Sequence, residues 1–257
     1  MLYKENELKK LLTTLLLSTF IYYSGCDNNS PDSYQISFHH WVDGEPLVLD
    51  SMIYQNAAGQ NYSIKSLKYL IRGFHLLEYD GPDDVNIHLM DNEKHFVTTD
   101  DPNTFILDFP PSSYGYSSGN HEKFAFTFGV DSSWIPPIND DATWGNDNFH
   151  TTMFWPESIG GGYHYMKLEG AFDNDSTFYY IHTGGTDGKD FTFTKEFDVD
   201  IRDNNDGSHH HIAINMDINN WFNNPNTISF TTDGIMENES IQQKLKENGE
   251  ADVFSVR

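Results

Sequence analysis

Histidines and tryptophans stand close together in two parts of the chain. Neutral imidazole is a good ligand for copper and zinc, and Cu²⁺ is bound most tightly of the divalent first-row metals. Cys26 is the only cysteine, so a site built from several thiolates is excluded. The pattern therefore favours a metal site made of imidazoles with an aromatic ring nearby. The residues concerned are His39 and His40, beside Trp41, in the first part, and His164 and His182 in the second.

Strand alternation decides which of the first three residues can face a core. The stretch YQISFHHW (34–41) alternates apolar and polar side chains, as a strand with one buried face does. It places His40 on the same face as the tyrosine, isoleucine and phenylalanine. His39 and Trp41 fall on the other face. At most one of the two adjacent histidines can therefore join a buried site.

The later histidines also fall in strand-like stretches. His182 shares a face with Phe178 and Tyr180, and His164 shares one with Met166. A single histidine in such a place is more often a hydrogen-bonded core residue than a metal ligand. Because His40 and His182 both lie on faces that we expect to point inward, they are the first choices. The predicted copper ligands, in order, are His40, His182, His39 and His164.

Other motifs are weaker or absent. The run of histidines at 209–211 alternates, so its outer members point to solvent and could pick up divalent metal weakly. A loose calcium site in DVDIRDNNDGS, from Asp198, Asp200, Asp203 and Asp206, is possible, although solvated loop acidity explains this stretch more simply. No serine-hydrolase elbow, zinc-protease motif or phosphate-binding loop is present.

Short strands must position these residues. The predicted strands are 34–41, 67–79, 85–91, 123–130, 162–172, 177–183, 190–201, 210–218 and 227–232. Only the stretch 239–248 reads as a helix, with Asn238 as its N-cap and Gly249 at its end. We therefore expect an all-β fold, an antiparallel β-sandwich with one short C-terminal helix. It forms a single domain over residues 34–257.

The N-terminus predicts export and a lipid anchor. Residues 1–25 have a basic start, an apolar run and small residues at the end, which is typical of a secretory signal peptide. Cys26 stands where a lipoprotein signal peptidase would leave an acylated first residue. Residues 26–33 then read as the acylated cysteine and a tether. We expect a protein held on the periplasmic or cell-surface side of the outer membrane.

The charge excludes one class of partner. With 39 acidic and 15 basic residues, the formal net charge is −24. Such a surface repels nucleic acid and attracts cations.

A longer stretch resembles a known family. MFWPESIGGGYHYMKLEGAF, followed by YYIHTGG, is similar to the MbnP-like copper-binding domains, which carry a Met-aromatic-Trp segment, a Gly-Tyr, a KLEG-like strand and a His-x-Gly stretch. The N-terminal stretch FHHWVDGEPLVLDSMIYQNAAGQNYSIKSLKYLIRGFHL agrees, especially with the lipoprotein branch of the Bacteroidetes type. The resemblance covers about residues 35 to 255.

The resemblance implies an exported β-rich domain with one copper ion held by histidine. In characterised relatives an oxidised tryptophan, kynurenine, is also a ligand, and a di-haem peroxidase is the implied oxidant. Trp155 matches the Met-aromatic-Trp position and His182 the His-x-Gly position, while His39 and His40 match an early histidine of the lipoprotein branch. Trp41 remains a second candidate for the oxidised residue. The chain lacks the paired cysteines of methanotroph members, so identical copper chemistry does not follow.

These observations predict a lipid-anchored protein for copper acquisition or handling that is not an enzyme. Two alternatives remain open. A surface sandwich that binds glycan or protein would explain the aromatic residues and the acidity. A metal-dependent hydrolase would need a carboxylate base such as Glu157 or Glu169.

Overall fold

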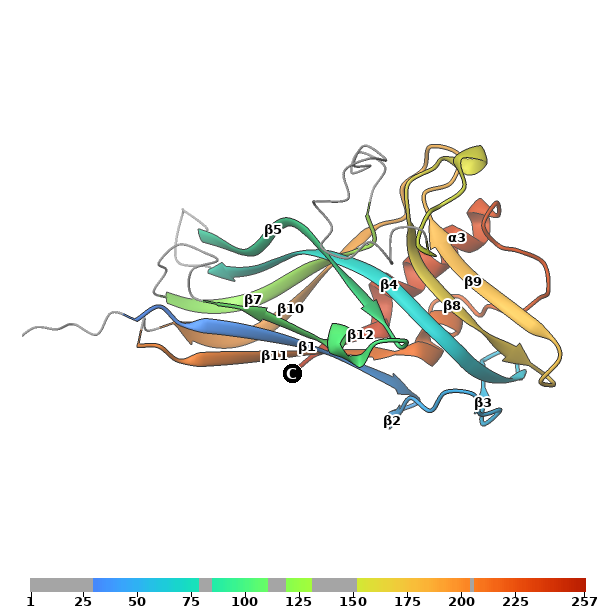
Figure 1. Ribbon diagram of the computed structural model, residues 1–257, viewed down its shortest axis with the longest axis horizontal. Helices are drawn as coiled ribbons and strands as arrows, with labels where there is room; N and C mark the ends of the chain where they lie inside the picture. Colours follow the sequence, from blue (N-terminus) through green and yellow to red (C-terminus); the bar gives the residue numbers. More distant parts are fainter. Residues whose placement is uncertain (1–29, 79–84, 111–118, 131–151, 204–205) are drawn as a thin grey trace, which may run out of the picture.

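Two β-sheets pack against each other in the computed structural model, which describes residues 30–78, 85–110, 119–130, 152–203 and 206–257 (Figure 1). The predicted fold class, an antiparallel β-sandwich with one short C-terminal helix, is confirmed. The predicted signal peptide and Cys26 lie outside the described residues. Within the described ranges, no helix is both long enough and apolar enough to cross a membrane.

The smaller sheet contains the first predicted strand. Its strands are β1 (Ser33–Val42), β2 (Glu45–Pro46), β6 (Ile106–Phe109), β11 (His209–Asp217) and β12 (Phe254–Val256). They lie in the order β12-β11-β1-β2, and β6 also pairs with β1. The pair β1 and β11 is parallel, whereas the other pairs of this sheet are antiparallel. Parallel neighbours need a crossover connection, and here most of the domain lies between the two strands.

The larger sheet is organised around one long strand. Its members are β3 (Tyr54–Gln55), β4 (Asn61–Glu78), β5 (Val85–Thr98), β7 (Gly119–Phe128), β8 (His164–Phe172), β9 (Phe178–Gly184) and β10 (Phe193–Asp203). The order is β10-β7-β4-β8-β9, and β3 and β5 also pair with β4. The first part of β4 pairs with β8 and the later part with β7. The hairpin of β8 and β9 therefore extends the sheet at one end (Figure 1).

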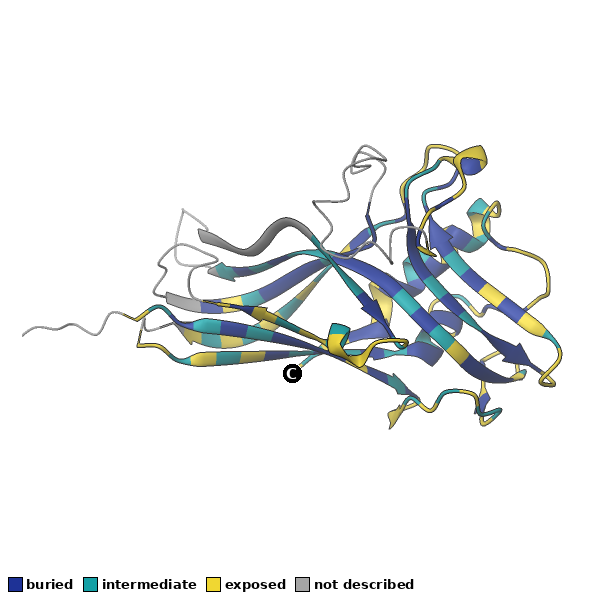
Figure 2. Cartoon of the chain, viewed as in Figure 1, coloured by how far each residue is buried: buried dark blue, intermediate teal, exposed yellow. Residues whose placement is uncertain are grey.

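The core fills the space between the two sheets. Alternate residues of β1, from Tyr34 to Val42, are buried, as the sequence pattern predicts. They pack against aromatic residues of the larger sheet; Phe38, for example, lies 6.2 Å from Phe74 between ring centroids. Figure 2 shows a similar alternation of buried and exposed residues in the first part of β9, whereas β8 is buried along most of its length. Each buried ring of this kind stabilises the fold by about 1.5–3 kcal/mol through removal of apolar surface from water.

Short helices close the ends of the sandwich. They are η1 (Pro102–Phe105), η5 (Glu157–Ile159), η6 (Ile218–Phe222), α3 (Glu239–Asn248) and η7 (Gly249–Val253). The bounds of α3 are those predicted, and the Asn238 side chain caps it by accepting a hydrogen bond from the Ile241 amide. Gly249 does not terminate the helical backbone as predicted. Its φ of −62° is helical, and the chain continues from α3 into the π-helical turn η7. Gly249 is small for another reason: a Cβ there would lie 2.4 Å from the Phe193 ring.

The predicted strand at 227–232 is wrong. The segment is irregular, although Ile228 and Phe230 are buried as its alternation indicated. The Phe230 amide donates to the side chain of Gln60, not to a neighbouring strand. Phe230 also stacks on Tyr179 at 4.1 Å between ring centroids. Burial here comes from a loop packed onto the sheet.

The ordered domain begins slightly earlier than the boundary predicted at residue 34. Asp32, assigned by the sequence to the tether, is fully buried. One of its carboxylate oxygens accepts hydrogen bonds from the amides of residues 206–208, and the other contacts Nε2 of His210 at 2.8 Å. Asp32 thus fixes the start of β1 to the start of β11.

Candidate metal centre

His40 points into the sandwich, as predicted, and is part of the core. Its Nε2 lies 3.1 Å from the Tyr69 hydroxyl on β4, and its ring packs edge-on against Phe105 at 4.9 Å. Burial, with a smaller contribution from the neighbouring His39, lowers the pKa of His40 to about 4. The imidazole is therefore neutral at pH 7 and hydrogen-bonded between the sheets.

His182 does not point inward, and this part of the prediction is wrong. It shares a face of β9 with Phe178 and Tyr180, as expected, but these two residues are 41% and 48% exposed. The inward positions belong to Tyr179 and Ile181, which are buried. Since His40 contacts the inner side of the larger sheet and His182 lies on its outer side, the two first-choice ligands do not meet.

A β-bulge brings His164 to the same outer face as His182. His164 pairs with Gly184, whereas Met166 pairs with Thr183, so one extra residue lies between them on β8. Because adjacent residues of β9 point to opposite faces, His164 and Met166 also face opposite ways. The prediction that they share a face is wrong for this reason. The His164 and His182 rings meet edge to face, with centroids 4.9 Å apart.

The segment before β8 folds back and places Trp155 against His164. The Trp155 amide donates to the Gly162 carbonyl, and the His164 amide donates to the Met153 carbonyl. The Trp155 ring packs edge-on against His164 with centroids 4.8 Å apart. It also lies over Gly184, where a Cβ would come within 2.6 Å of the indole. Gly184, the glycine of the His-x-Gly stretch, thus lets the indole of Trp155 pack directly against the backbone of β9.

Nitrogen atoms in this cluster are buried without partners. Among the described residues, both ring nitrogens of His164 and the indole nitrogen of Trp155 lack a hydrogen bond of good geometry. Burial, with the neighbouring His182 second, lowers the pKa of His164 to about 3; the nearby Met153 carbonyl opposes this only in part. An unsatisfied buried polar group costs about 1–3 kcal/mol. A neutral imidazole that is buried and unpaired has its lone pair available for a metal ion.

Glu169 orients His182. Its Oε1 lies 2.8 Å from Nε2 of His182 and 3.7 Å from Nζ of Lys167. The hydrogen bond from His182 and the nearby positive charge of Lys167 hold the pKa of the Glu169 carboxyl below its ordinary value, although burial opposes this by raising the pKa. An ionised Glu169 accepts a hydrogen bond from Nε2–H of His182. The other ring nitrogen, Nδ1, then carries the lone pair that can bind a metal ion. We call the group formed by Trp155, His164 and His182 the WHH cluster.

The WHH cluster is an incomplete set of ordinary metal ligands. In the described part of the chain, no three histidine, cysteine, aspartate or glutamate side chains are placed to hold one ion. Two imidazoles nevertheless suit copper, and the indole of Trp155 contacts one of them, that of His164. The two imidazoles therefore fit a copper ion as ligands, and they leave its coordination incomplete.

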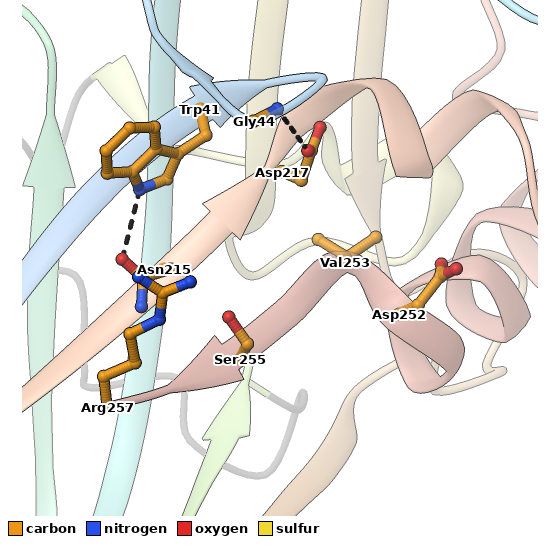
Figure 3. Close-up of a pocket in the computed structure, with 8 residues that line it drawn as sticks. All are labelled: Trp41, Gly44, Asn215, Asp217, Asp252, Val253, Ser255 and Arg257. Atoms are coloured by element: carbon orange, nitrogen blue, oxygen red, sulfur yellow. Dashed lines mark hydrogen bonds between the residues drawn. The ribbon is translucent and has the colours of Figure 1, made fainter.

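His39 and Trp41 lie elsewhere, on the outer face of the smaller sheet. His39 is exposed, and its Nε2 lies 2.9 Å from the Ser37 hydroxyl. The Trp41 indole donates to Oδ1 of Asn215 at 3.1 Å and borders a polar pocket (Figure 3). The other lining residues are Gly44, Asn215, Asp217, Asp252, Val253, Ser255 and Arg257. With its nitrogen paired and no histidine in the pocket, Trp41 is the weaker of the two tryptophan candidates.

Within the described part of the chain, the carboxylates considered for a hydrolase or a calcium site are not gathered into one group of ligands. The side chain of Asp203, from the predicted calcium site, lies outside the described residues. Glu157 is exposed at the start of η5, and the low pKa of Glu169 makes it a poor general base. Asp198, from the loose calcium site, instead forms an ion pair with Lys123 at 2.6 Å.

Sequence reasoning missed the role of two residues. It considered Glu169 only as a hydrolytic base, although Glu169 sets the orientation of His182. The strand predicted at 177–183 stops one residue short of Gly184, which ends β9 beneath the indole. The spacing of the KLEG and His-x-Gly stretches, paired as a hairpin, was the signal that could have placed both next to His182.

Comparison with known proteins agrees with the resemblance. The sequence profile of the MbnP family matches residues 31–242. Among solved structures, MbnP from Methylosinus trichosporium is 11% identical, with a TM-score of 0.48, and the alignment covers 88% of this chain and 98% of that one. No curated protein matches the chain. Because the family profile spans most of the sequence, the chain belongs to the MbnP family.

Proposed function

We propose that the protein binds one copper ion at the WHH cluster and serves in copper acquisition or handling, without a catalytic reaction of its own. One observation carries this proposal. His164 is buried, neutral and without a hydrogen bond at either ring nitrogen, and it touches both His182 and Trp155. A core histidine normally has a partner, as His40 has in Tyr69.

Each residue of the cluster has a separate task. His164 offers a lone pair in a dry environment, where competition from water is weak. His182 offers Nδ1, because Glu169 holds its other nitrogen. The adjacent Lys167 neutralises part of the charge of Glu169 and also donates to the Thr152 carbonyl, which ties the covering segment to β8.

Trp155 is the residue that we propose to be oxidised. Opening of its indole ring to kynurenine would expose a carbonyl oxygen and an aromatic amine beside His164. Its position over Gly184 fixes the ring next to His164. A di-haem peroxidase, the partner implied by the family resemblance, is the oxidant that we propose.

We also propose that the protein is exported and anchored through an acylated Cys26 on the periplasmic or cell-surface side of the outer membrane. The sequence pattern of residues 1–26 supports this proposal. A surface position would place the copper site where external copper is first met.

Copper analysis of purified variants tests the function. The unaltered protein is loaded with copper and then dialysed to remove ions held by fewer ligands at the surface; it is expected to retain about one ion per chain by elemental analysis, at the WHH cluster. His164→Ala and His182→Ala should each lose it. His40→Gln should retain it, because His40 lies between the sheets. Copper retained by both cluster variants would refute the assignment. Copper lost only in His40→Gln would instead support the ligand predicted first from the sequence, His40.

Intact mass tests the tryptophan. Protein isolated from its native host should carry the mass change of one tryptophan-to-kynurenine conversion, located by peptide mapping to Trp155. Conversion at Trp41 instead would contradict the assignment. An unmodified chain without copper would favour the surface-binding alternative, to which the exposed Phe178 and Tyr180 would then belong.

A further inference from the structure

A second group of histidines meets on the outer face of the smaller sheet, away from the WHH cluster. The Ser37 hydroxyl lies 2.9 Å from Nε2 of His39 and 2.8 Å from Nε2 of His211. Both histidines are exposed, whereas Ser37 is 7% exposed. The same nitrogen of each ring therefore converges on a single oxygen atom held in the sheet.

The strand register explains this convergence. His211 lies directly opposite Gln35 in the parallel pair of β1 and β11. The Gln35 amide is bound at 2.8 Å to Asp108 of β6, on the other side of β1. The Gln35 side chain is therefore directed toward β6, and the His211 side chain reaches along β1 to the Ser37 hydroxyl. His39 reaches the same hydroxyl from the next outward position of β1.

We propose that His39 and His211 form a second site, for a divalent first-row transition metal ion, on the outer face of β1 and β11. A serine hydroxyl donates to one imidazole and accepts from the other, so both Nε2 atoms already point at one small polar group. Metal–imidazole bonds are about 2.0–2.1 Å long. Small rotations of two exposed side chains bring both nitrogens to an ion beside the hydroxyl, and water completes its coordination.

Charge and ligand type define the ion. Two imidazoles and no thiolate select copper or zinc, and Cu²⁺ binds more tightly than Zn²⁺ to such a set. The net charge of −24 raises the local concentration of cations at the surface. The site lies on a different sheet from the WHH cluster, so each can be removed without the other.

The test is a calorimetric titration of the purified chain with Cu²⁺. Far-ultraviolet circular dichroism checks that each variant is folded. His39→Ala/His211→Ala should bind one equivalent fewer than the unaltered chain. The control, His209→Ala, removes an exposed histidine of the same strand face that bonds to Ser33 instead, and it should bind the full number. A double variant that binds as many ions as the unaltered chain overturns the proposal.

The result is separable from the function proposed above. The variants His164→Ala and His182→Ala report on the WHH cluster, while the His39/His211 pair accounts for its own equivalent whether or not the cluster binds copper. A second measurement needs no variant. Cu²⁺ should broaden the nuclear magnetic resonance signals of the His39 and His211 rings together, at lower concentration than that of His209; equal broadening of all three contradicts a built site.

Discussion

At the scale of residues, the state of each histidine follows from its partners. His40 and His164 are both buried and both have strongly lowered pKa values, to about 4 and about 3. Of the two rings, only that of His40 has a hydrogen bond of good geometry, with the Tyr69 hydroxyl. The same residue type is thus a core element in one place and a candidate ligand in the other. Composition alone cannot separate these roles, because the difference lies in what packs around each ring.

Acid should destabilise the metal-free protein through His40. In the unfolded chain a histidine takes up a proton near pH 6.5, whereas folded His40 stays neutral until about pH 4. The unfolded state therefore binds more protons between these values, and the free energy of unfolding falls as the pH drops from 6.5 towards 4. Each fully unmatched proton contributes a slope of about 1.4 kcal/mol per pH unit.

Urea unfolding at several pH values between 4.5 and 7 measures this slope. His40→Gln keeps a group that can bond to Tyr69 but does not titrate, so its slope should be smaller by up to about 1.4 kcal/mol per pH unit. His209→Gln, at an exposed position, is the matched control and should leave the slope unchanged. Identical slopes in the His40 variant and the unaltered protein would contradict a buried neutral His40.

At the scale of elements, the bulge in β8 and the hairpin partner β9 create the WHH cluster. The sequence predicted both strands, which the structure confirms, but the alternation predicted for β8 is interrupted at the bulge. It could not predict the extra residue between His164 and Met166, because a one-residue change in register leaves no mark on apolar alternation over so short a stretch. Whether the Phe178 face of β9 pointed inward was also undecidable, since both faces of that strand carry aromatic residues.

Gly184→Ala should disrupt the cluster through one methyl group. The new Cβ would lie 2.6 Å from the indole of Trp155, so the ring must move away from the histidines. Overpacking of this kind typically costs about 1–3 kcal/mol. We expect a lower free energy of unfolding in urea and a loss of copper at the WHH cluster. Gly234→Ala is the matched control, because nothing lies within 4 Å of its Cβ; equal behaviour of the two variants would show that the indole does not rest on Gly184.

At the scale of the whole molecule, the sequence predicted an acidic, single-domain β-sandwich, and the fold class is confirmed. The parallel pairing of β1 with β11 escaped prediction, since it joins two segments from opposite ends of the domain. Long-range pairing of this kind depends on the packing of the whole chain. The same pairing creates the His39–His211 group, which no local pattern could indicate.

The proposed lipid anchor concerns the whole molecule and can be tested directly. Cys26→Ser should shift the protein from the membrane fraction to the soluble fraction, because the variant has no thiol to acylate. Metabolic labelling with a fatty acid should mark the unaltered protein and not the variant. Equal partitioning of the two forms would argue for an ordinary cleaved signal and against the anchor.

The most direct measurement is X-ray diffraction from copper-loaded crystals at the copper absorption edge. The account predicts an anomalous peak at the WHH cluster, within bonding distance of His164 and of Nδ1 of His182, and beside Trp155. A peak beside His40 between the sheets, or a copper-loaded crystal with no peak at the WHH cluster, would contradict it.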